Sequence, residues 1–246
     1  MLSKTHAKYI QSLHHKKFRD AENCFIAEGG KVVLELLSSK KFRCREIYGL
    51  QQWLNSNEAF IRKYFSGPLE VIQDYELEKI SALTTASQVL AIFEKVENTP
   101  ISVLNKISLV LDDIQDPGNL GTIVRIADWF GIKDIVCSLH TADMYNPKVV
   151  QSTMGSLGRV NVLYTELAPW IQQHRDVKLY AAALDGKNIK DIQLREGLLL
   201  IGNEGKGISE QLMKMADERI TIPKTGAAES LNAAVATGIV LSHIIF

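Results

Sequence analysis

Glycines and polar side chains gather in three segments after residue 107, and each segment includes or follows an apolar run. The segments are residues 116–125, 200–209 and 220–238. Glycine lets a backbone approach a ligand closely, and neighbouring polar side chains supply hydrogen bonds. These segments are therefore the candidates for chemistry in this sequence.

The segment DPGNLGTIVR predicts a turn followed by a helix. Pro117 and Gly118 favour the turn, and we expect Gly121 to open the helix, whose free backbone N–H groups can face an anion. Arg125 lies about one helical turn further on, so its guanidinium can return to the mouth of the loop. An ordinary turn between strand and helix, with a surface arginine, explains the segment equally well.

The segment LIGNEGKGIS places Gly202, Gly205 and Gly207 around Glu204. A carboxylate repels phosphate, and the spacing matches neither the GxGxxG nor the GxxxxGK[ST] nucleotide-binding motif. A nucleoside-type ligand with a positive charge suits this loop better than a nucleotide does. A plain strand-to-helix turn is the alternative.

The third segment, ITIPKTGAAESLNAAVATG, has Pro223 at the end of an apolar run and a permissive loop around Gly226. Ser230 stands where a helix is expected to begin, so capping that helix is its simplest role. Asn232 follows within one helical turn. The small residues after Asn232 permit close helix packing, either internally or across a subunit interface.

The elements that must position these segments are predicted from the apolar runs, which are nearly continuous rather than alternating. This pattern is typical of parallel strands buried on both faces. The helical stretches between the runs indicate βαβ units and a doubly wound α/β sheet. The predicted strands are ISLVLDDI, KDIVCSL, VKLYAAALD, GLLLIGNE and RITIPK.

The chain divides by pattern into residues 1–95, a linker at 96–106, and residues 107–246. The first part alternates predicted helices and strands, beginning with a basic helix in KYIQSLHHKKFRD. The linker contains Pro100 and has no periodicity. Residues 1–45 hold ten Lys and Arg against four Asp and Glu, which leaves eighteen against twenty-four for the rest. A basic face for a polyanion is one interpretation, and a solvated helix face is the other.

Composition sets broad limits on the class of protein. The 246 residues are 46% hydrophobic and 23% charged, which is typical of a globular chain. Three widely spaced cysteines form no CxxC pair, so we expect reduced thiols in a cytoplasmic protein and no metal site. We also expect no signal peptide and no membrane helix, because no apolar run is long enough.

Together, and in this order, the three segments resemble the SpoU/TrmH family of RNA ribose 2′-O-methyltransferases in the SPOUT superfamily. The stretches that carry the resemblance are LVLDDIQDPGNLGTIVRIADWFGI, LLLIGNEGKGIS and ITIPKTGAAESLNAAVATGIVL. The resemblance implies methyl transfer from S-adenosylmethionine to a ribose 2′-hydroxyl. It also implies a deep C-terminal trefoil knot in the parallel-sheet α/β domain, and a homodimer in which two subunits complete each active site.

The first part of the chain is also similar to this family, through LHHKKFRDAENCFIAEGGKVVLELL. That stretch resembles the family's N-terminal substrate-binding domain, which has a ribosomal-protein-like α/β fold. Because the likeness is to members that act on ribosomal RNA, it implies a 23S-type ribosomal RNA substrate in preference to tRNA.

The resemblance also implies roles for individual residues. The polar catalytic cluster would comprise Asn119, Arg125, Glu204, Ser230 and Asn232, and the cofactor would contact Gly202, Gly205, Ile222 and Leu231. Two roles are open for Arg125: it clamps an RNA phosphate and orients the ribose, or it loses a proton in a desolvated site and acts as the base. A guanidinium normally keeps its charge, which favours the clamp.

Basic residues of the first part are candidates for contacts with the RNA backbone, and such contacts give an affinity that falls with salt. They are Lys4, Lys8, Lys16, Lys17 and Arg19. Two other functions remain as alternatives. One is an RNA-binding protein that keeps the fold without catalysis. The other is a dinucleotide-dependent oxidoreductase, which requires a GxGxxG motif that GNLG lacks.

Overall fold

A computed structural model describes residues 2–97 and 99–245, and these residues form two compact units. The first unit contains residues 1–97 together with residues 143–159. The second unit contains residues 98–142 and 160–246. Residues 143–159 lie in the second half of the sequence and nevertheless pack with the first.

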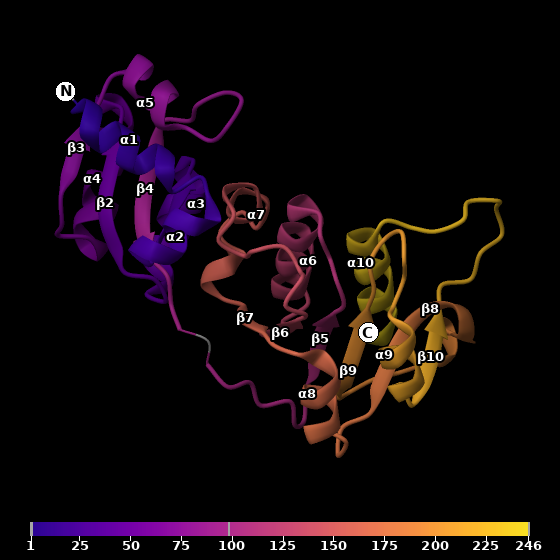
Figure 1. Cartoon of the computed structure of the whole chain (residues 1–246). Helices are drawn as coiled ribbons and strands as arrows, with labels where there is room; N and C mark the ends of the chain where they lie inside the picture. Colours follow the sequence, from indigo (N-terminus) through magenta and orange to yellow (C-terminus); the bar gives the residue numbers. More distant parts are fainter. Residues whose placement is uncertain (1, 98, 246) are drawn as a thin grey trace. The chain divides into compact units, whose positions relative to one another are not determined.

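The first unit is a four-stranded sheet with helices around it (Figure 1). The strand order is β1-β4-β2-β3, in which β4 pairs antiparallel with both β1 and β2. Its elements are α1 (Lys4–Ser12), α2 (Lys16–Glu22), β1 (Cys24–Glu28), α3 (Gly30–Ser39), β2 (Cys44–Gly49), α4 (Gln51–Tyr64), β3 (Leu69–Val71), α5 (Asp74–Ile80), β4 (Val89–Glu94), α7 (Pro147–Ser152) and η1 (Ser156–Gly158).

The basic N-terminal segment forms two helices, where the sequence predicted one. Helix α1 ends at Ser12, and α2 begins at Lys16. Arg19 holds this break, because its Nη1 donates to the carbonyl oxygens of Leu13, at 3.0 Å, and His14, at 2.8 Å. A cationic donor at the carbonyl end of a helix satisfies groups that the helix itself leaves unpaired.

Residues 143–159 pack against the rest of the first unit through an ion pair and through a close backbone approach. Arg19 Nη2 lies 2.6 Å from Asp143 Oδ2, and both side chains are largely shielded from solvent. Gly155 lies so close to α3 that an added Cβ would be 2.4 Å from the Cβ of Glu35. A side chain larger than hydrogen is therefore excluded at this position.

The second unit is a six-stranded parallel sheet, as the continuous apolar runs predicted. The strand order is β10-β8-β9-β5-β6-β7. Its elements are β5 (Ile107–Leu111), α6 (Pro117–Trp129), β6 (Asp134–Cys137), β7 (Asn161–Tyr164), α8 (Leu167–Gln173), β8 (Leu179–Asn188), η2 (Ile189–Asp191), β9 (Gly197–Ile201), α9 (Glu210–Met215), β10 (Glu218–Thr221) and α10 (Ala233–Ile244).

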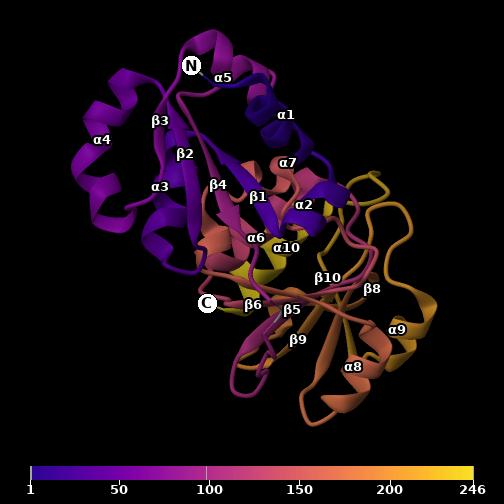
Figure 2. The same cartoon turned by 60° about the vertical axis from the view of Figure 1, so that its left-hand side comes forward.

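Helices cover this sheet in pairs. Helix α8 packs beside α9, and their apolar residues share a core with alternate residues of the strands, among them Val110, Leu198 and Leu200. Helix α6 packs beside α10 (Figures 1 and 2). The expected linker supplies part of the same core, since Ile101 and Val103 are buried in it. In the part of the chain that the structure describes, no helix is long and apolar enough to span a membrane.

Candidate active site at the carboxyl ends of β5, β9 and β10

The strand order places a topological switch point between β5 and β9. From β5 the chain moves outward to β6 and β7, and it then returns to build β8 and β9 on the other side of β5. In open parallel sheets, ligands bind in the crevice outside the carboxyl ends of the strands at such a point. The segments that follow β5 and β9 are residues 112–116 and 202–209. The first leads into sequence segment 116–125, and the second lies within sequence segment 200–209.

The loop after β9 is closed by its own backbone and by one side chain. Asn203 and Gly207 exchange two backbone hydrogen bonds, of 3.1 and 2.9 Å. The side-chain oxygen of Asn203 accepts from the backbone N–H groups of Gly205 and Lys206. An added Cβ on Gly202 would lie 2.3 Å from the carbonyl carbon of Gly207, so only glycine fits there. We call residues 202–207 the glycine loop.

Two hydrogen bonds attach this region to the segment after β5. Asn203 Nδ2 donates to the carbonyl oxygen of Asp113 at 2.8 Å, and the backbone N–H of Ser209 donates to Asp112 Oδ2 at 2.8 Å. Asp113 has a φ of 60°, a left-handed conformation that Asp and Asn tolerate better than most residues. These hydrogen bonds hold the carboxyl ends of β5 and β9 together.

Asn119 joins all three sequence segments. Its Nδ2 donates to Glu204 Oε1 at 2.5 Å, and its Oδ1 accepts from Asn232 Nδ2 at 2.9 Å. Both bonds fix the orientation of the Asn119 amide, since one uses its donor and the other its acceptor. The sequence-predicted residues Asn119, Glu204 and Asn232 thus lie in one hydrogen-bonded chain.

Helix ends differ from the expectations in two places. Helix α6 begins at Pro117, with the carboxylate of Asp116 accepting from the N–H of Asn119, so Gly121 does not open the helix. Helix α10 is capped by Asn232, whose Oδ1 accepts from the N–H groups of Ala234 and Val235. The capping role predicted for Ser230 was therefore wrong, because the helix starts two residues later than expected.

Three further predicted residues, Ile222, Ser230 and Leu231, lie on the segment between β10 and α10. Ile222 is half-buried directly after β10, while Ser230 and Leu231 are exposed. An added Cβ on Gly226 would meet no atom within 4 Å among the described residues. Figure 1 shows this segment as a long open loop drawn in yellow. Its backbone is thus accessible to a ligand.

Arg125 stands apart from the hydrogen-bonded chain. It lies on the exposed side of α6, and within the described residues its side chain forms no hydrogen bond or ion pair. Trp129, one turn further along the same helix, is 85% exposed. Residues four apart on a helix share one face, so Arg125 and Trp129 face the same way.

The five basic residues predicted to contact RNA divide into two groups. Lys4, Lys8, Lys16 and Lys17 are exposed, and Lys16 pairs with Asp20 at 2.8 Å. Arg19 is only 1% exposed and uses its guanidinium on carbonyl oxygens and on Asp143. The prediction that Arg19 contacts RNA is contradicted, because this side chain has a structural role instead.

Sequence reasoning missed Asp112, Asp113 and Asn203, which hold the strand ends together. A usable signal was present for Asn203, since asparagine in a turn commonly accepts a hydrogen bond from the backbone N–H two residues ahead. The two aspartates follow an apolar run, but nothing local shows which backbone groups they meet. Among the described residues, no group of His, Cys, Asp or Glu is arranged to hold a metal ion.

Comparison with protein families gives two matches that together span most of the chain. Residues 106–242 match the SpoU rRNA Methylase family. Residues 4–91 match the MRM3-like substrate binding domain.

Individual proteins of known description are similar over the same regions. The chain is 34% identical to the 23S rRNA (guanosine(2553)-2′-O)-methyltransferase RlmP of Bacillus subtilis, over 95% of this chain and 93% of that one. It is 33% identical to the 23S rRNA (uridine(2479)-2′-O)-methyltransferase of Streptomyces viridochromogenes, over 55% of this chain and 50% of that one. The crystal structure of an AdoMet-bound rRNA methyltransferase from Sinorhizobium meliloti matches with a TM-score of 0.86 and 30% identity, covering 99% of this chain and 95% of that one.

Proposed function

The chain belongs to the SpoU rRNA methylase family and is an RNA 2′-O-methyltransferase that uses S-adenosylmethionine, and we propose that its substrate is a ribose in 23S-type ribosomal RNA. The full-length similarity to the Bacillus subtilis enzyme supports this substrate. The match of residues 4–91 to a substrate-binding domain supports it too.

One observation carries the proposed site: the side chain of Asn119 bonds to Glu204 and Asn232 at the same time. These three residues belong to three different segments and are at least 28 positions apart in the sequence, and their hydrogen bonds bring the three segments together at one place. We therefore place methyl transfer at the carboxyl ends of β5, β9 and β10.

The residues present fit S-adenosylmethionine. Gly202 and Gly205 keep side chains away from the backbone of the glycine loop, while Ile222 and Leu231 offer apolar side chains on the segment between β10 and α10. We assign these four residues to the cofactor. The carboxylate of Glu204, held by Asn119, suits a ligand with a positive charge. When bound, the cofactor supplies an electrophilic methyl group on a sulfonium.

The protein's own task is to orient the ribose and to remove or transfer the proton of its hydroxyl. We assign the orienting role to Arg125, whose charged fork matches a phosphate bidentately and whose side chain is free of ion pairs within the described residues. Asn119, Ser230 and Asn232 supply neutral hydrogen-bonding groups near the sugar. Lys4, Lys8, Lys16 and Lys17 then add contacts to the RNA backbone.

We further propose a homodimer through α6 and α10. Trp129 of α6 and Val235 of α10 are 85% and 51% exposed, and exposed apolar side chains of this size favour a partner surface. Arg125 shares a helix face with Trp129, so a dimer formed through this face would place Arg125 at the interface. The close packing of α10 on α6 is also compatible with the trefoil knot of the family. A cytoplasmic location agrees with a ribosomal RNA substrate.

The deciding experiment supplies the purified chain with methyl-labelled S-adenosylmethionine and, separately, 23S ribosomal RNA, 16S ribosomal RNA and tRNA. We expect label in 23S RNA at one nucleotide, resistant to alkaline cleavage because the 2′-hydroxyl is blocked. The same nucleotide should lose its ribose methyl in cells that lack the gene. Label on a base, or label in tRNA alone, would overturn the proposed substrate.

A further inference from the structure

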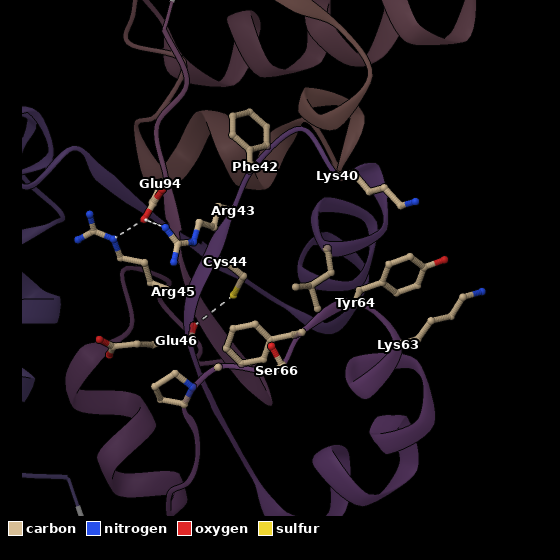
Figure 3. A pocket seen from close by; sticks show the side chains of 14 residues that line it. Lys40, Phe42, Arg43, Cys44, Arg45, Glu46, Lys63, Tyr64, Ser66 and Glu94 are labelled. Atoms are coloured by element: carbon tan, nitrogen blue, oxygen red, sulfur yellow. Dashed lines mark hydrogen bonds and ion pairs between the residues drawn. The ribbon is translucent and has the colours of Figure 1, made fainter.

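The first unit contains a cavity of about 730 Å³ that the methyl-transfer site does not use. It lies between the end of α3, the start of β2, the end of α4 and the turn that leads into β3 (Figure 3). Its lining is Leu37, Lys40, Phe42, Arg43, Cys44, Arg45, Glu46, Lys63, Tyr64, Phe65, Ser66, Gly67, Pro68 and Glu94. The volume is within the range of small-ligand pockets, which is about 300–1,000 Å³.

The cavity has an excess of positive charge. Four of its lining residues are basic and two are acidic. Glu94 binds Arg45 Nε at 3.0 Å and lies 3.5 Å from Arg43 Nη1, as Figure 3 shows, so one carboxylate serves two guanidinium groups. The Arg43 side chain is still 81% exposed.

The two lysines, Lys40 and Lys63, add to the excess of positive charge in the cavity, and the other carboxylate, Glu46, has partners of its own. Glu46 is engaged by His6 Nε2 at 2.9 Å and by the hydroxyl of Tyr48. Lys40 and Lys63 are exposed and form no ion pair with any residue that the structure describes. Figure 3 shows these two lysines on either side of the Tyr64 ring. The Nζ of Lys63 lies 5.2 Å from the centroid of the Tyr64 ring, and both ammonium groups can still approach an anion at the rim because neither side chain forms an ion pair with a described residue.

Aromatic and apolar groups form the rest of the wall. Tyr64 is half-buried, and its ring packs against Phe60 with centroids 4.9 Å apart. Phe65 lies directly against Gly67, where an added Cβ would come within 2.7 Å of the phenyl ring. The absence of a side chain at Gly67 therefore lets this ring line the cavity.

Cys44 adds an uncharged group to the lining. Burial raises the pKa of the Cys44 thiol to about 12, so the thiol stays protonated at neutral pH. Exposed basic side chains next to an aromatic wall suit a ligand with one anionic end and one flat end. An unpaired nucleotide has this composition, with its phosphate outside and its base inside.

We propose that this cavity binds one unpaired nucleotide of the RNA substrate, with Lys40, Arg43 and Lys63 around its phosphate and its base against Tyr64 and Phe65. The proposal rests on the proposed function only in taking RNA as the ligand. It places an RNA contact at the end of the sheet where β2 begins, separate from the lysines of α1 and α2.

The test measures binding of a fluorescein-labelled single-stranded oligoribonucleotide to the full chain by anisotropy, at several salt concentrations. Replacing Arg43→Gln or Lys63→Gln removes one phosphate contact, so the slope of log affinity against log salt should fall by about 0.7. Arg62→Gln is the matched control. It removes one charge from the neighbouring position, where Arg62 pairs with Glu58 outside the cavity.

Substitutions at Tyr64 test whether the base of the nucleotide stacks on the Tyr64 ring. Tyr64→Leu should weaken binding about tenfold because a stacking surface is lost, and Tyr64→Phe should keep the affinity. Thermal unfolding of both variants separates a stacking effect from a folding defect. Cross-linking with an RNA that carries 4-thiouridine should attach the base to the peptide that contains Tyr64 and Phe65.

The outcomes separate this inference from the proposed function. If RNA is methylated normally while the variants at 43, 63 and 64 bind like the parent and no cross-link maps to this peptide, the cavity is not an RNA site. If the cross-link and salt slopes appear as expected but no ribose is methylated, the cavity assignment stands and the proposed function fails. Equal losses in Arg62→Gln and Lys63→Gln would show nonspecific charge attraction and overturn the inference.

Discussion

Asn232 donates a hydrogen bond to Asn119 across 113 positions of sequence, and the same side chain caps helix α10. One oxygen of Asn232 supports the helix, and its nitrogen holds the amide of Asn119. Folding of the C-terminal helix and assembly of the site therefore share one residue.

The two roles of Asn232 can be separated by substitution. Asn232→Ala should lower the free energy of unfolding by about 1 kcal/mol, as loss of a helix cap usually does, and should also reduce methyl transfer. Asn232→Asp keeps an acceptor for the cap but loses the donor to Asn119, so it should reduce methyl transfer at nearly unchanged stability. Urea unfolding and single-turnover rates check this; equal stability loss in both variants would contradict it.

Replacing Glu204→Gln tests the charge at the glycine loop. Glutamine can still accept from Asn119, so the loop should keep its structure. Affinity for S-adenosylmethionine should fall about tenfold, while affinity for the neutral thioether S-adenosylhomocysteine stays the same. Calorimetry with both ligands measures the difference, and a parallel loss for both would show that Glu204 acts through loop structure alone.

Arg125→Lys tests bidentate recognition. Lysine keeps the positive charge but lacks the planar fork, so kcat should fall about tenfold or more with cofactor binding unchanged. The kcat of Arg125→Ala should fall further, because this variant lacks the positive charge as well as the fork. Near-full turnover by the lysine variant would count against the proposed role of Arg125.

Trp129→Glu tests the proposed dimer face. A carboxylate at this 85% exposed position should convert dimers to monomers and suppress methyl transfer, since burying an unpaired charge in an apolar interface is costly. Leu104→Glu, at a position 55% exposed outside α6 and α10, is the control and should leave the assembly unchanged. Sedimentation at several concentrations reports the result. A parent chain that is monomeric throughout would refute the dimer.

Glu76 gives an acid-dependent contribution to stability. Its pKa is lowered by the backbone N–H of Gln73, at 3.0 Å, and by that of Leu2, at 2.7 Å, because both donors favour the charged carboxylate. A lowered folded-state pKa stabilises the protein above the ordinary value of 4.5, and this contribution is lost as the pH falls through the folded-state value. Glu76→Gln should therefore be less stable than the parent at pH 7, and the difference should shrink below pH 4.5. A difference independent of pH would contradict this.

Periodicity was sufficient to predict the parallel sheet of the second unit, because buried strands such as β5 and β9 are apolar throughout. Strand β7 was missed. It has four residues at the edge of the sheet, and only one of them is buried, so it leaves no apolar run to detect.

Within the candidate site, family motifs predicted that Asn119, Glu204 and Asn232 belong together, and the hydrogen bonds join them. Local sequence could not indicate the cap of α10, because Ser230 and Asn232 have similar capping preference and the fold selects between them. The structural role of Arg19 could not be predicted from local sequence either, because its partner Asp143 lies 124 positions away.

The ion pair between Arg19 and Asp143 determines which fragments of the chain can fold alone. A fragment that stops at residue 97 keeps Arg19 but loses Asp143, together with Tyr145, Val149 and Val150, which are buried in the intact chain. A buried guanidinium deprived of its partner costs about 3–5 kcal/mol, and the apolar surface under α7 would be exposed as well. Residues 1–97 expressed alone should therefore be insoluble or unfolded. A grafted copy of residues 143–159 should be needed for this unit to fold.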